Sequence, residues 1–592
     1  MRWFVFAQVA IIGSLFGVGY FHALDGPIVN TTYGAIQGIL GLSRNGTIFH
    51  KFLGIPYAAA PVDELRFEPP QLPEKWEGIR NGAHTGSECL QIELLFGYVT
   101  GHEDCLFLNV FTRNIPTCTP TPDSPCDDKD LLPVMVYIHG GFLHNGGSNL
   151  YQPNYFMDED VVFVTMNYRL AALGFLSTGD DIIRGNMGFK DQTMALRWVN
   201  QNIRAFGGDP KRITLFGESC GGMSVHYHML SPMSKGLVSR YLSQSGIALH
   251  FWTLKKDPKR QAYYFGQRLG CLQNDTKELA LCLKTVPAAD IVETYRGILN
   301  PLRDHVLLYK AVVEVVDDEN AFITKHPRDI LQSGNFTRRP WMTGFNSAEG
   351  LFLGATILGN NRLAQMAQNK WNEFAPKLLV YEKNDNASQK IFDHYFGNTS
   401  DITTLSNINT YGQMIGDRVF YPEIHQTIML QSKFSPVYAY QYSYRGLWTT
   451  VNLFYGIHGH LPRIIEGGWS ALKAGNGKAH DWVNHHMHRT VPNYGTSHSD
   501  ELAVQFYMPW ASNVYEEHQD YPMSVEVVKL WVAYATMTNQ TEMVFRNVTW
   551  RPVKAAYGTA NYLDINMEPR IINITLNETI EFWGSLNLTD IS

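Results

Sequence analysis

The chain has 592 residues, of which 45% are hydrophobic and 17% are charged, so it can bury a large core and does not belong to the disordered class. Its 48 basic and 55 acidic side chains give a formal charge of −7, and no Lys/Arg cluster suited to a phosphate backbone occurs, which excludes nucleic acid as an expected partner. Length alone would suggest roughly three or four domains of about 150 residues.

The N-terminal segment is apolar. One early charge, Arg2, precedes an apolar run from Trp3 to about Phe21 that ends near Ala23. A run of this length suits either a signal anchor or a cleaved secretory leader, and its small-residue exit favours the leader. We therefore expect residues 1–23 to be a signal peptide, and we expect no stable membrane anchor in the chain that follows.

Glycosylation sequons also indicate export. Asn-x-Ser/Thr is the acceptor pattern for N-linked glycans and marks surface positions in secreted proteins. Together with the leader, the sequons predict a secreted, extracellular glycoprotein. The eleven sequons lie at Asn30, Asn45, Asn274, Asn335, Asn386, Asn398, Asn539, Asn547, Asn573, Asn577 and Asn587.

The seven cysteines comprise three close pairs and Cys220, which stands alone. Short loops between cysteines suit local disulfide bonds in an oxidising compartment, although spacing does not fix the pairing. The three candidate disulfide bonds join Cys89 to Cys105, Cys118 to Cys126 and Cys271 to Cys282.

Strand-like and helix-like segments alternate in the middle third of the chain. Val-rich apolar runs at 131–138 and 161–168 predict buried strands. Apolar residues at helical spacing predict a helix over 188–206, and a strand over 213–216 and a helix over 223–230 follow. This alternation predicts a parallel sheet covered by helices on both faces. Because no linker divides the chain, we expect one large domain.

The pentapeptide Gly-Glu-Ser-Cys-Gly at 217–221 lies directly between that strand and that helix. A sharp strand-to-helix turn with flanking glycines would hold Ser219 outward as a nucleophile. The alternative is a glycine-rich turn with an idle serine. Upstream, Tyr-Ile-His-Gly-Gly-Phe at 137–142 follows another strand, where backbone N–H groups could form an oxyanion hole or an ordinary glycine turn.

Several further stretches, scattered along the chain, have a distinctive sequence. They are residues 191–219, Phe-Leu-Gly-Ile-Pro-Tyr at 52–57, Glu-Asp-Cys-Leu at 103–106, Asn-Tyr-Arg at 167–169 and Ser-Gln-Ser-Gly at 243–246. Together they resemble the type-B carboxylesterase/cholinesterase family, and in particular its insect-type carboxylesterases, over nearly the whole mature chain. The resemblance implies one α/β-hydrolase domain over residues 24–592, with a large, mostly parallel central sheet and helices on both faces.

The same resemblance completes a catalytic triad around Ser219. Residues 341–350 resemble the family's acid-bearing segment, which implies Glu349, and residues 495–502 resemble its histidine motif, which implies His498. His458 is the rival base, because the stretch before His498 is longer than the family usually has. An insertion over 451–489 would account for this excess length.

Two positions depart from the family pattern. Phe142 stands where the family has a third glycine, and Cys220 stands where it has a small alanine. Both positions contribute main-chain N–H groups, so an oxyanion hole of Gly141, Phe142 and Cys220 can persist. The thiol of Cys220 either packs as an unreactive apolar group or has a lowered pKa, because the helix dipole at the start of a helix favours the thiolate.

The resemblance therefore implies a serine carboxylic-ester hydrolase that forms an acyl-serine intermediate and needs no metal or organic cofactor. Residues 485, 486 and 488 are a histidine cluster that lacks the spacing of a metal site. The loop between Cys89 and Cys105 lacks a tryptophan for a choline ester, so we expect neutral lipophilic esters: xenobiotic, pheromone-like, lipid or juvenile-hormone-like. The alternatives are a non-catalytic adhesion protein of the same fold and a slowly turning over ester scavenger.

Overall fold

A computed structural model describes the chain at residues 26–94, 97–116, 131–296, 300, 302, 308–459, 492–508, 511, 513–538, 542–554 and 558–590. Several expectations fall outside these residues. They concern the leader at 1–23, the disulfide bond expected between Cys118 and Cys126, the sequon at Asn539, and the histidines at 485, 486 and 488.

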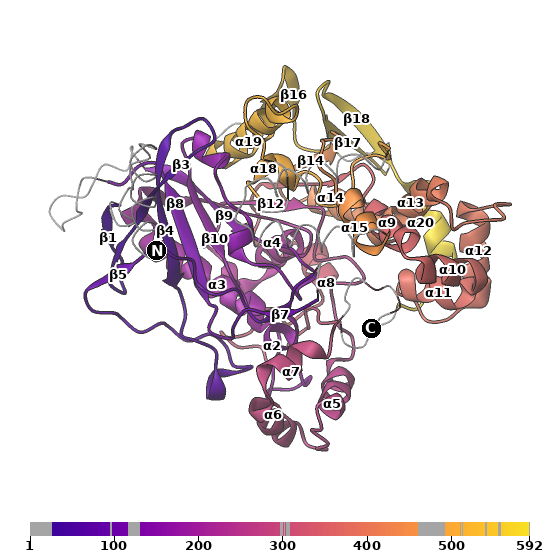
Figure 1. Cartoon of the computed structure of the whole chain (residues 1–592), viewed down its shortest axis with the longest axis horizontal. Helices are drawn as coiled ribbons and strands as arrows, with labels where there is room; N and C mark the ends of the chain where they lie inside the picture. The colour runs from indigo at the N-terminus through magenta and orange to yellow at the C-terminus, as the bar shows by residue number, and fades with distance from the viewer. Residues whose placement is uncertain are drawn as a thin grey trace, which may run out of the picture.

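An 11-stranded sheet forms the centre of the molecule (Figure 1). Its middle strands run parallel, in the spatial order β10 (Val162–Met166), β9 (Leu132–Ile138), β11 (Gly208–Glu218), β12 (Arg240–Gln244), β13 (Trp341–Asn346), β14 (Val437–Tyr442) and β17 (Thr559–Ile565). Antiparallel strands extend both edges: β8 (Phe107–Thr112), β4 (Ile48–Pro56) and β3 (Ile39–Leu42) beyond β10, and β18 (Arg570–Thr575) beyond β17.

Small sheets and many helices surround this centre. The small sheets contain β1 (Ile28–Asn30), β2 (Ala35–Gln37) and β5 (Ile79–Asn81); β6 (Gln91–Ile92) and β7 (Val99–Thr100); and β15 (Met543–Phe545) and β16 (Val548–Trp550). The helices are α2 (Ala171–Phe175), α3 (Met187–Asn202), α4 (Cys220–Leu230), α5 (Pro258–Arg268), α6 (Thr276–Thr285), α7 (Ala288–Glu293), α8 (Pro327–Ser333), α9 (Leu351–Gly359), α10 (Asn361–Asn369), α11 (Trp371–Leu378), α12 (Asp385–Tyr395), α13 (Ile408–Val419), α14 (Tyr421–Gln431), α15 (Thr450–Gly459), α18 (Leu502–Gln505), α19 (Tyr521–Thr536) and α20 (Asn577–Ser585).

The two faces of the sheet bury separate cores. Along β9, Val134 and Val136 belong to one apolar cluster, while Met135 and Tyr137 belong to the other, as expected when side chains alternate across a strand. Residues of α3 and α4 pack into the first cluster and residues of α18 and α19 into the second. The expected fold class, a mostly parallel sheet with helices on both faces, is therefore confirmed.

Several element boundaries differ from the sequence expectations. Strand β10 covers Val162–Met166 rather than 161–168, and β11 covers Gly208–Glu218 rather than 213–216. Helix α4 begins at Cys220 rather than at residue 223, because the two glycines in its first turn hide a helix from propensity-based reasoning. The α-helix predicted to residue 206 ends at Asn202 and continues as a short 3₁₀ turn over Ile203–Phe206. Gly207, with a φ of 81°, terminates this turn.

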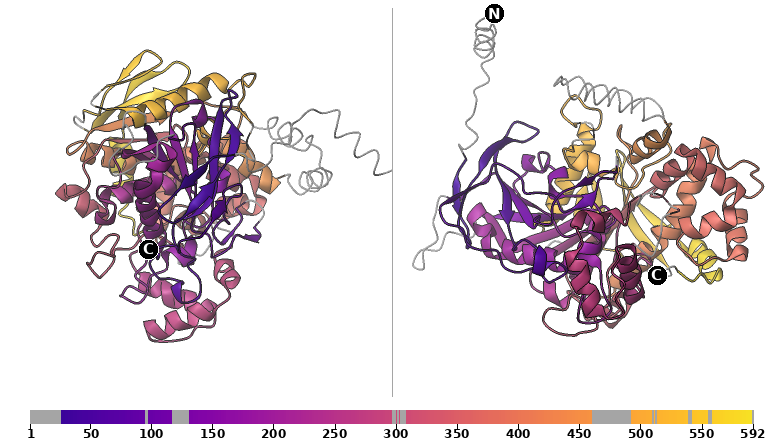
Figure 2. Two further views of the ribbon diagram at one scale, coloured as in Figure 1. Left: turned by 90° about the vertical axis from the view of Figure 1, so that its left-hand side faces the viewer. Right: turned by 60° about the horizontal axis from the view of Figure 1, so that its bottom comes forward.

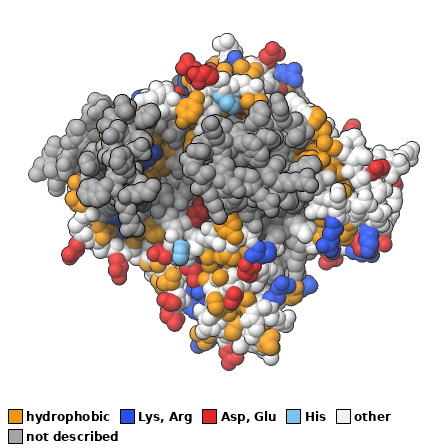
Figure 3. Space-filling view, in the orientation of Figure 1, with side chains coloured by type: hydrophobic (Ala, Val, Ile, Leu, Met, Phe, Trp, Pro, Cys, Tyr) orange, Lys and Arg blue, Asp and Glu red, His pale blue; other side chains and the backbone are white. Residues whose placement is uncertain are grey.

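Segments far apart in sequence form a helical cluster at one end of the sheet. Figures 1 and 2 show the C-terminal α20 beside α10–α13, and the ring of Phe582 stacks on His394 at 3.9 Å. The indole N–H of Trp583 donates to the hydroxyl of Tyr395 at 3.1 Å. On the face in Figure 3, acidic, basic and apolar side chains intermingle over the lobe of α5–α7.

Two of the three expected disulfide bonds are present. They join Cys89 to Cys105 and Cys271 to Cys282. The third does not appear among the disulfide bonds of the described residues, because both Cys118 and Cys126 lie outside them. The bond between Cys118 and Cys126 is therefore not confirmed and stays a prediction.

The asparagines of the expected glycosylation sequons can be located on the described surface. The ten described sequon asparagines are all exposed. Within the residues that the structure covers, no helix combines the length and apolar character needed to cross a bilayer.

Candidate active site

Ser219 occupies the sharp turn between β11 and α4. Its φ of 58° and ψ of −124° are strained for a residue with a Cβ. The turn is held because the N–H of Ser219 donates to the carbonyl of Gln244 at 2.8 Å. Glycine is required beside it, since a Cβ on Gly221 would lie 2.1 Å from the carbonyl oxygen of Ile138. The local sequence therefore presents Ser219 at the carboxyl edge of the sheet.

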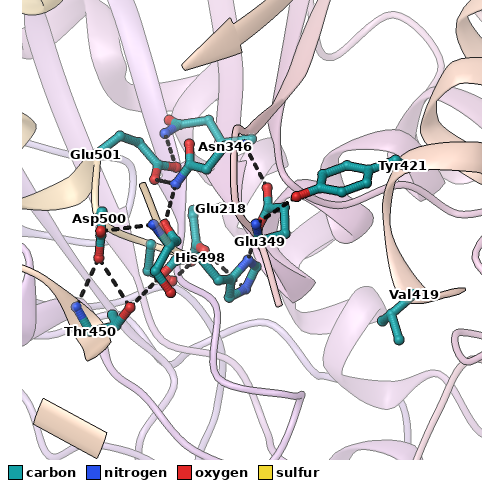
Figure 4. A network of polar contacts seen from close by, with 12 residues as sticks. Glu218, Asn346, Glu349, Val419, Tyr421, Thr450, His498, Asp500 and Glu501 are labelled. Carbon is teal, nitrogen blue, oxygen red and sulfur yellow. Dashed lines mark hydrogen bonds and ion pairs between the residues drawn. The ribbon is translucent and has the colours of Figure 1, made fainter. Parts of the chain in front are cut away.

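Glu349 and His498 are brought together from segments 149 residues apart. Nδ1 of His498 lies 2.6 Å from Oε2 of Glu349 (Figure 4). The other carboxylate oxygen of Glu349 accepts the N–H of Asn346 at 2.7 Å, and the hydroxyl of Tyr421 accepts the N–H of Glu349 at 2.8 Å. The carboxylate is fully buried, so these contacts fix both its position and its orientation.

The loop that carries His498 is anchored by Asp500. Its carboxylate accepts the N–H groups of Ser497 and Thr450, each at 2.8 Å, and the hydroxyl of Thr449 at 2.8 Å. The hydroxyl of Thr450 donates to the carbonyl of His498 at 3.0 Å. The start of α15 thereby holds the histidine segment in place (Figure 4).

A second carboxylate, Glu218, faces the other ring nitrogen of the histidine. Oε1 of Glu218 lies 3.3 Å from Nε2 of His498 and accepts the hydroxyl of Ser499 at 2.6 Å. Sequence reasoning missed this residue, although it stands directly before Ser219. The only sequence signal was an acidic side chain inside the turn, because the contact depends on a segment 281 residues away.

The charges around His498 shift several pKa values. Burial lowers the pKa of His498, but the carboxylates of Glu218 and Glu349 raise it by more, to about 9. Burial raises the pKa of Glu218, an effect that the imidazole partly offsets. Burial and the neighbouring Glu218 raise the pKa of Glu501 to about 8. The site thus favours the protonated imidazolium of His498, and burial also favours the protonated forms of Glu218 and Glu501.

The expected oxyanion-hole residues lie beside Ser219. Gly141 and Phe142 have φ values of 106° and 60°, which turn this loop sharply beside Ser219. Cys220 begins α4, where the first N–H groups of a helix lack intrahelical acceptors. Burial raises the pKa of the Cys220 thiol well above its ordinary value. The hypothesis of a lowered pKa is therefore wrong, because desolvation outweighs the effect of the helix start.

Two cavities meet at Ser219, His498 and Phe142. The smaller cavity, of about 100 Å³, is lined among others by Phe251, Trp252, Val419 and Phe420. The larger cavity, of about 510 Å³, is lined among others by Tyr151, Glu218, Trp448, Leu453 and Phe454. Both are predominantly apolar, so a bound molecule would contact hydrocarbon surface on either side of the serine.

The rival histidine occupies another position. His458 belongs to the last turn of α15, and its side chain is outside the described part of the structure. The nitrogen beside Glu349 comes from His498. The described residues contain no group of three or more His, Cys, Asp or Glu side chains able to hold a metal ion.

Comparison with known proteins extends over nearly the entire chain. A model of the carboxylesterase family matches residues 25–583. A carboxylic ester hydrolase of Bombus ignitus is 34% identical over 95% of this chain and 95% of its own. Juvenile hormone esterase of Tribolium castaneum is 32% identical over 88% and 85%, respectively, and venom carboxylesterase-6 of Apis mellifera is 37% identical over 71% and 75%. The chain therefore belongs to the carboxylesterase family and is an ester hydrolase.

Proposed function

We propose that this protein is a secreted serine carboxylesterase, with Ser219 as nucleophile, His498 as general base and Glu349 as the orienting acid. The contact of 2.6 Å between His498 and Glu349 carries the proposal, because His498 also lines, together with the strained Ser219, both of the cavities beside the turn. A buried acid, a histidine and a serine hydroxyl arranged in this way form a catalytic triad for acyl transfer.

The proposed reaction has two halves. Nε2 of His498 takes the proton of Ser219 as its oxygen attacks the ester carbonyl, and the N–H groups of Gly141, Phe142 and Cys220 stabilise the oxyanion. Collapse releases the alcohol, which takes the proton from His498, and leaves an acyl-serine. Water activated by the same imidazole then releases the acid.

Neutral lipophilic esters are the proposed substrates, since most of the surface that both cavities present is apolar. Xenobiotic, pheromone-like, lipid and juvenile-hormone-like esters all fit this description. The relatives named for juvenile hormone and for pyrethroid hydrolysis, the latter a mouse protein 34% identical over 74% of this chain, support testing hormone-like and xenobiotic esters first.

Export is part of the proposal. The apolar N-terminal run supports a leader over residues 1–23, which would precede one catalytic domain over 24–592. Two disulfide bonds and ten exposed sequon asparagines agree with an extracellular, glycosylated product.

A burst assay with p-nitrophenyl butyrate tests the catalytic proposal. We expect steady hydrolysis by the parent and a loss of about 10⁴-fold or more in Ser219→Ala. Ser224→Ala is the matched control, because Ser224 is buried on α4 and its hydroxyl donates to the carbonyl of Cys220 at 2.7 Å, within the helix. A burst without turnover would indicate a scavenger, and no acylation of a folded parent would indicate an adhesion protein.

The base is tested in parallel. We expect His498→Ala to lower kcat by several orders of magnitude, as removal of a triad member does, whereas His458→Ala should retain most activity. The reverse ranking would contradict the assignment of His498. Fluorescence-monitored melting of both variants checks that each remains folded.

A further inference from the structure

One wall of the smaller cavity is built from two segments that are distant in sequence. Phe251 and Trp252 follow β12, whereas Val419 ends α13 and Phe420 lies between α13 and α14. The indole N–H of Trp252 donates to the carbonyl of Val419 at 3.1 Å. The width of the cavity therefore depends on how firmly these two segments are held together.

Glu423, on the first turn of α14, joins the same two segments. One carboxylate oxygen lies 2.9 Å from Nδ1 of His250, and the other accepts the N–H of Phe251 at 3.1 Å. His250 is 2% exposed; its ring stacks on Trp252 at 4.9 Å and meets Phe420 edge-on at 6.1 Å. We call this set of contacts, from Glu423 through His250 to Trp252, the cavity clasp.

The clasp also borders the catalytic residues. The ring centroids of Phe420 and His498 lie 4.9 Å apart. The hydroxyl of Tyr421 accepts the N–H of Glu349. Glu423 itself lines neither cavity among the described lining residues. Its influence on the reaction must therefore pass through the residues that it holds.

The geometry indicates which part of an ester occupies the smaller cavity. Nε2 of His498 must deliver a proton to the leaving alcohol, and this nitrogen lies 3.3 Å from Glu218. Glu218 lines the larger cavity and is not among the described residues lining the smaller one. His498 lines both cavities, but the side of Nε2 that faces Glu218 belongs to the larger one, so we assign the leaving alcohol to the larger side, of about 510 Å³, and the acyl group to the smaller side, of about 100 Å³.

We propose that Glu423 is a positioning residue that holds the wall of the smaller cavity through His250 and Phe251 and thereby restricts the enzyme to esters of short acyl groups. The proposal rests on the serine carboxylesterase function above. It concerns selectivity between acyl groups, which a residue with a purely structural role would leave unchanged.

The experiment compares p-nitrophenyl butyrate with p-nitrophenyl octanoate. The parent should prefer butyrate. Glu423→Leu keeps a similar size but removes both acceptors, and we expect it to raise the octanoate/butyrate ratio of kcat/KM by roughly five- to tenfold, as the loss of one or two hydrogen bonds allows. Glu423→Gln, which still accepts from Phe251 and offers His250 a polar partner, should retain most of the parental ratio.

His425→Leu is the matched control. His425 lies on the same helix as Glu423 and is as buried as His250, but its ring bonds Tyr562 and Gly558 at 2.9 Å each, away from the cavity. This variant should lower the melting temperature without changing the octanoate/butyrate ratio of kcat/KM.

A second control varies the alcohol. Glu423→Leu should change kcat/KM by the same factor for a series of butyrate esters of increasingly bulky alcohols, so that only acyl selectivity shifts.

Three results would overturn the proposal: an unchanged acyl ratio in folded Glu423→Leu, a shift confined to the alcohol series, or a parent that prefers octanoate. If Glu423→Leu does not fold, His250→Leu makes the same comparison from the other side of the contact. Failure of the underlying function is distinguishable, because the parent would then hydrolyse both esters no faster than Ser219→Ala.

Discussion

At the scale of single residues, two carboxyl groups, one on each side of the ring, set the protonation of His498, the proposed general base. Glu349 contacts Nδ1 and Glu218 faces Nε2 of His498. Because both favour the charged imidazole, the pKa of His498 is raised to about 9. The imidazole must be neutral to accept a proton from Ser219, so activity should rise as pH increases through that pKa.

Replacing Glu218 should shift this dependence. Glu218→Gln keeps the shape but removes a charge that raises the pKa of His498, so we expect the rising limb of kcat/KM against pH to move to lower pH. The profile of p-nitrophenyl butyrate hydrolysis between about pH 5 and 10 measures this. Glu578→Gln, an exposed position on α20, is the control. A limb that stays in place or moves to higher pH would contradict the role given to Glu218.

At the scale of elements, the strand-turn-helix of β11 and α4 depends on close backbone contact. Gly221 lies against β9, and Gly246 lies against the turn, since a Cβ there would approach the carbonyl of Ser219 to 1.9 Å. These neighbouring atoms belong to the backbone, which cannot move aside for an added Cβ as a flexible side chain could. The glycines therefore let α4 start close enough to the sheet to place the N–H of Cys220 beside Ser219.

Gly221→Ala tests this packing. We expect it to destabilise the protein by about 1–3 kcal/mol, as overpacking does, and to lower kcat because the first turn of α4 must move. Thermal unfolding and kcat for p-nitrophenyl butyrate measure the two effects. Gly584→Ala on α20 is the control, since its Cβ would meet nothing within 4 Å. Equal stability and activity of the two variants would contradict the close-contact explanation.

At the scale of the whole molecule, the described sequon asparagines are spread along the chain and all lie at the surface. Described sequons occur from Asn30 in the first strand to Asn587 just after α20, and all are exposed. Glycans at such positions need not disturb either core, because both cores lie against the central sheet. The cavities beside Ser219 have no sequon asparagine among their described lining residues.

Secretion is tested on protein expressed with its own N-terminus in insect cells. We expect protein in the medium whose chain begins near residues 20–25, with glycans on most sequon asparagines, because they are exposed. Intact-mass measurement and peptide mapping before and after deglycosylation provide the readout, and asparagines outside sequons serve as the internal control. A product retained in the cytosol with Met1 intact would refute export.

Peptide maps of the same protein, recorded without reduction, test the disulfide bond expected between Cys118 and Cys126, which lie outside the described residues. We expect a peptide linking Cys118 to Cys126, because a short loop between two cysteines closes readily in an oxidising compartment. The linked peptides of Cys89 with Cys105 and of Cys271 with Cys282 are the internal standard. Either Cys118 or Cys126 recovered as a free thiol would rule out that pair.

The sequence by itself determined the fold class and the position of Ser219, because these depend on local patterns: apolar runs of strand length, helical spacing and a glycine-bounded serine between a strand and a helix. Glu349 and His498 were indicated through the resemblance of the segments around them to the carboxylesterase family. The start of α4 was misplaced because its glycines oppose helix propensity, and the pKa of Cys220 was misjudged because burial is not visible in a local pattern. Only the tertiary structure decided that Glu218 faces Nε2 of His498, that Glu423 clasps His250 and Phe251, and that two unequal cavities meet at the serine. Those features arise where side chains from distant segments pack against one another, and such contacts leave no periodicity or spacing along the chain.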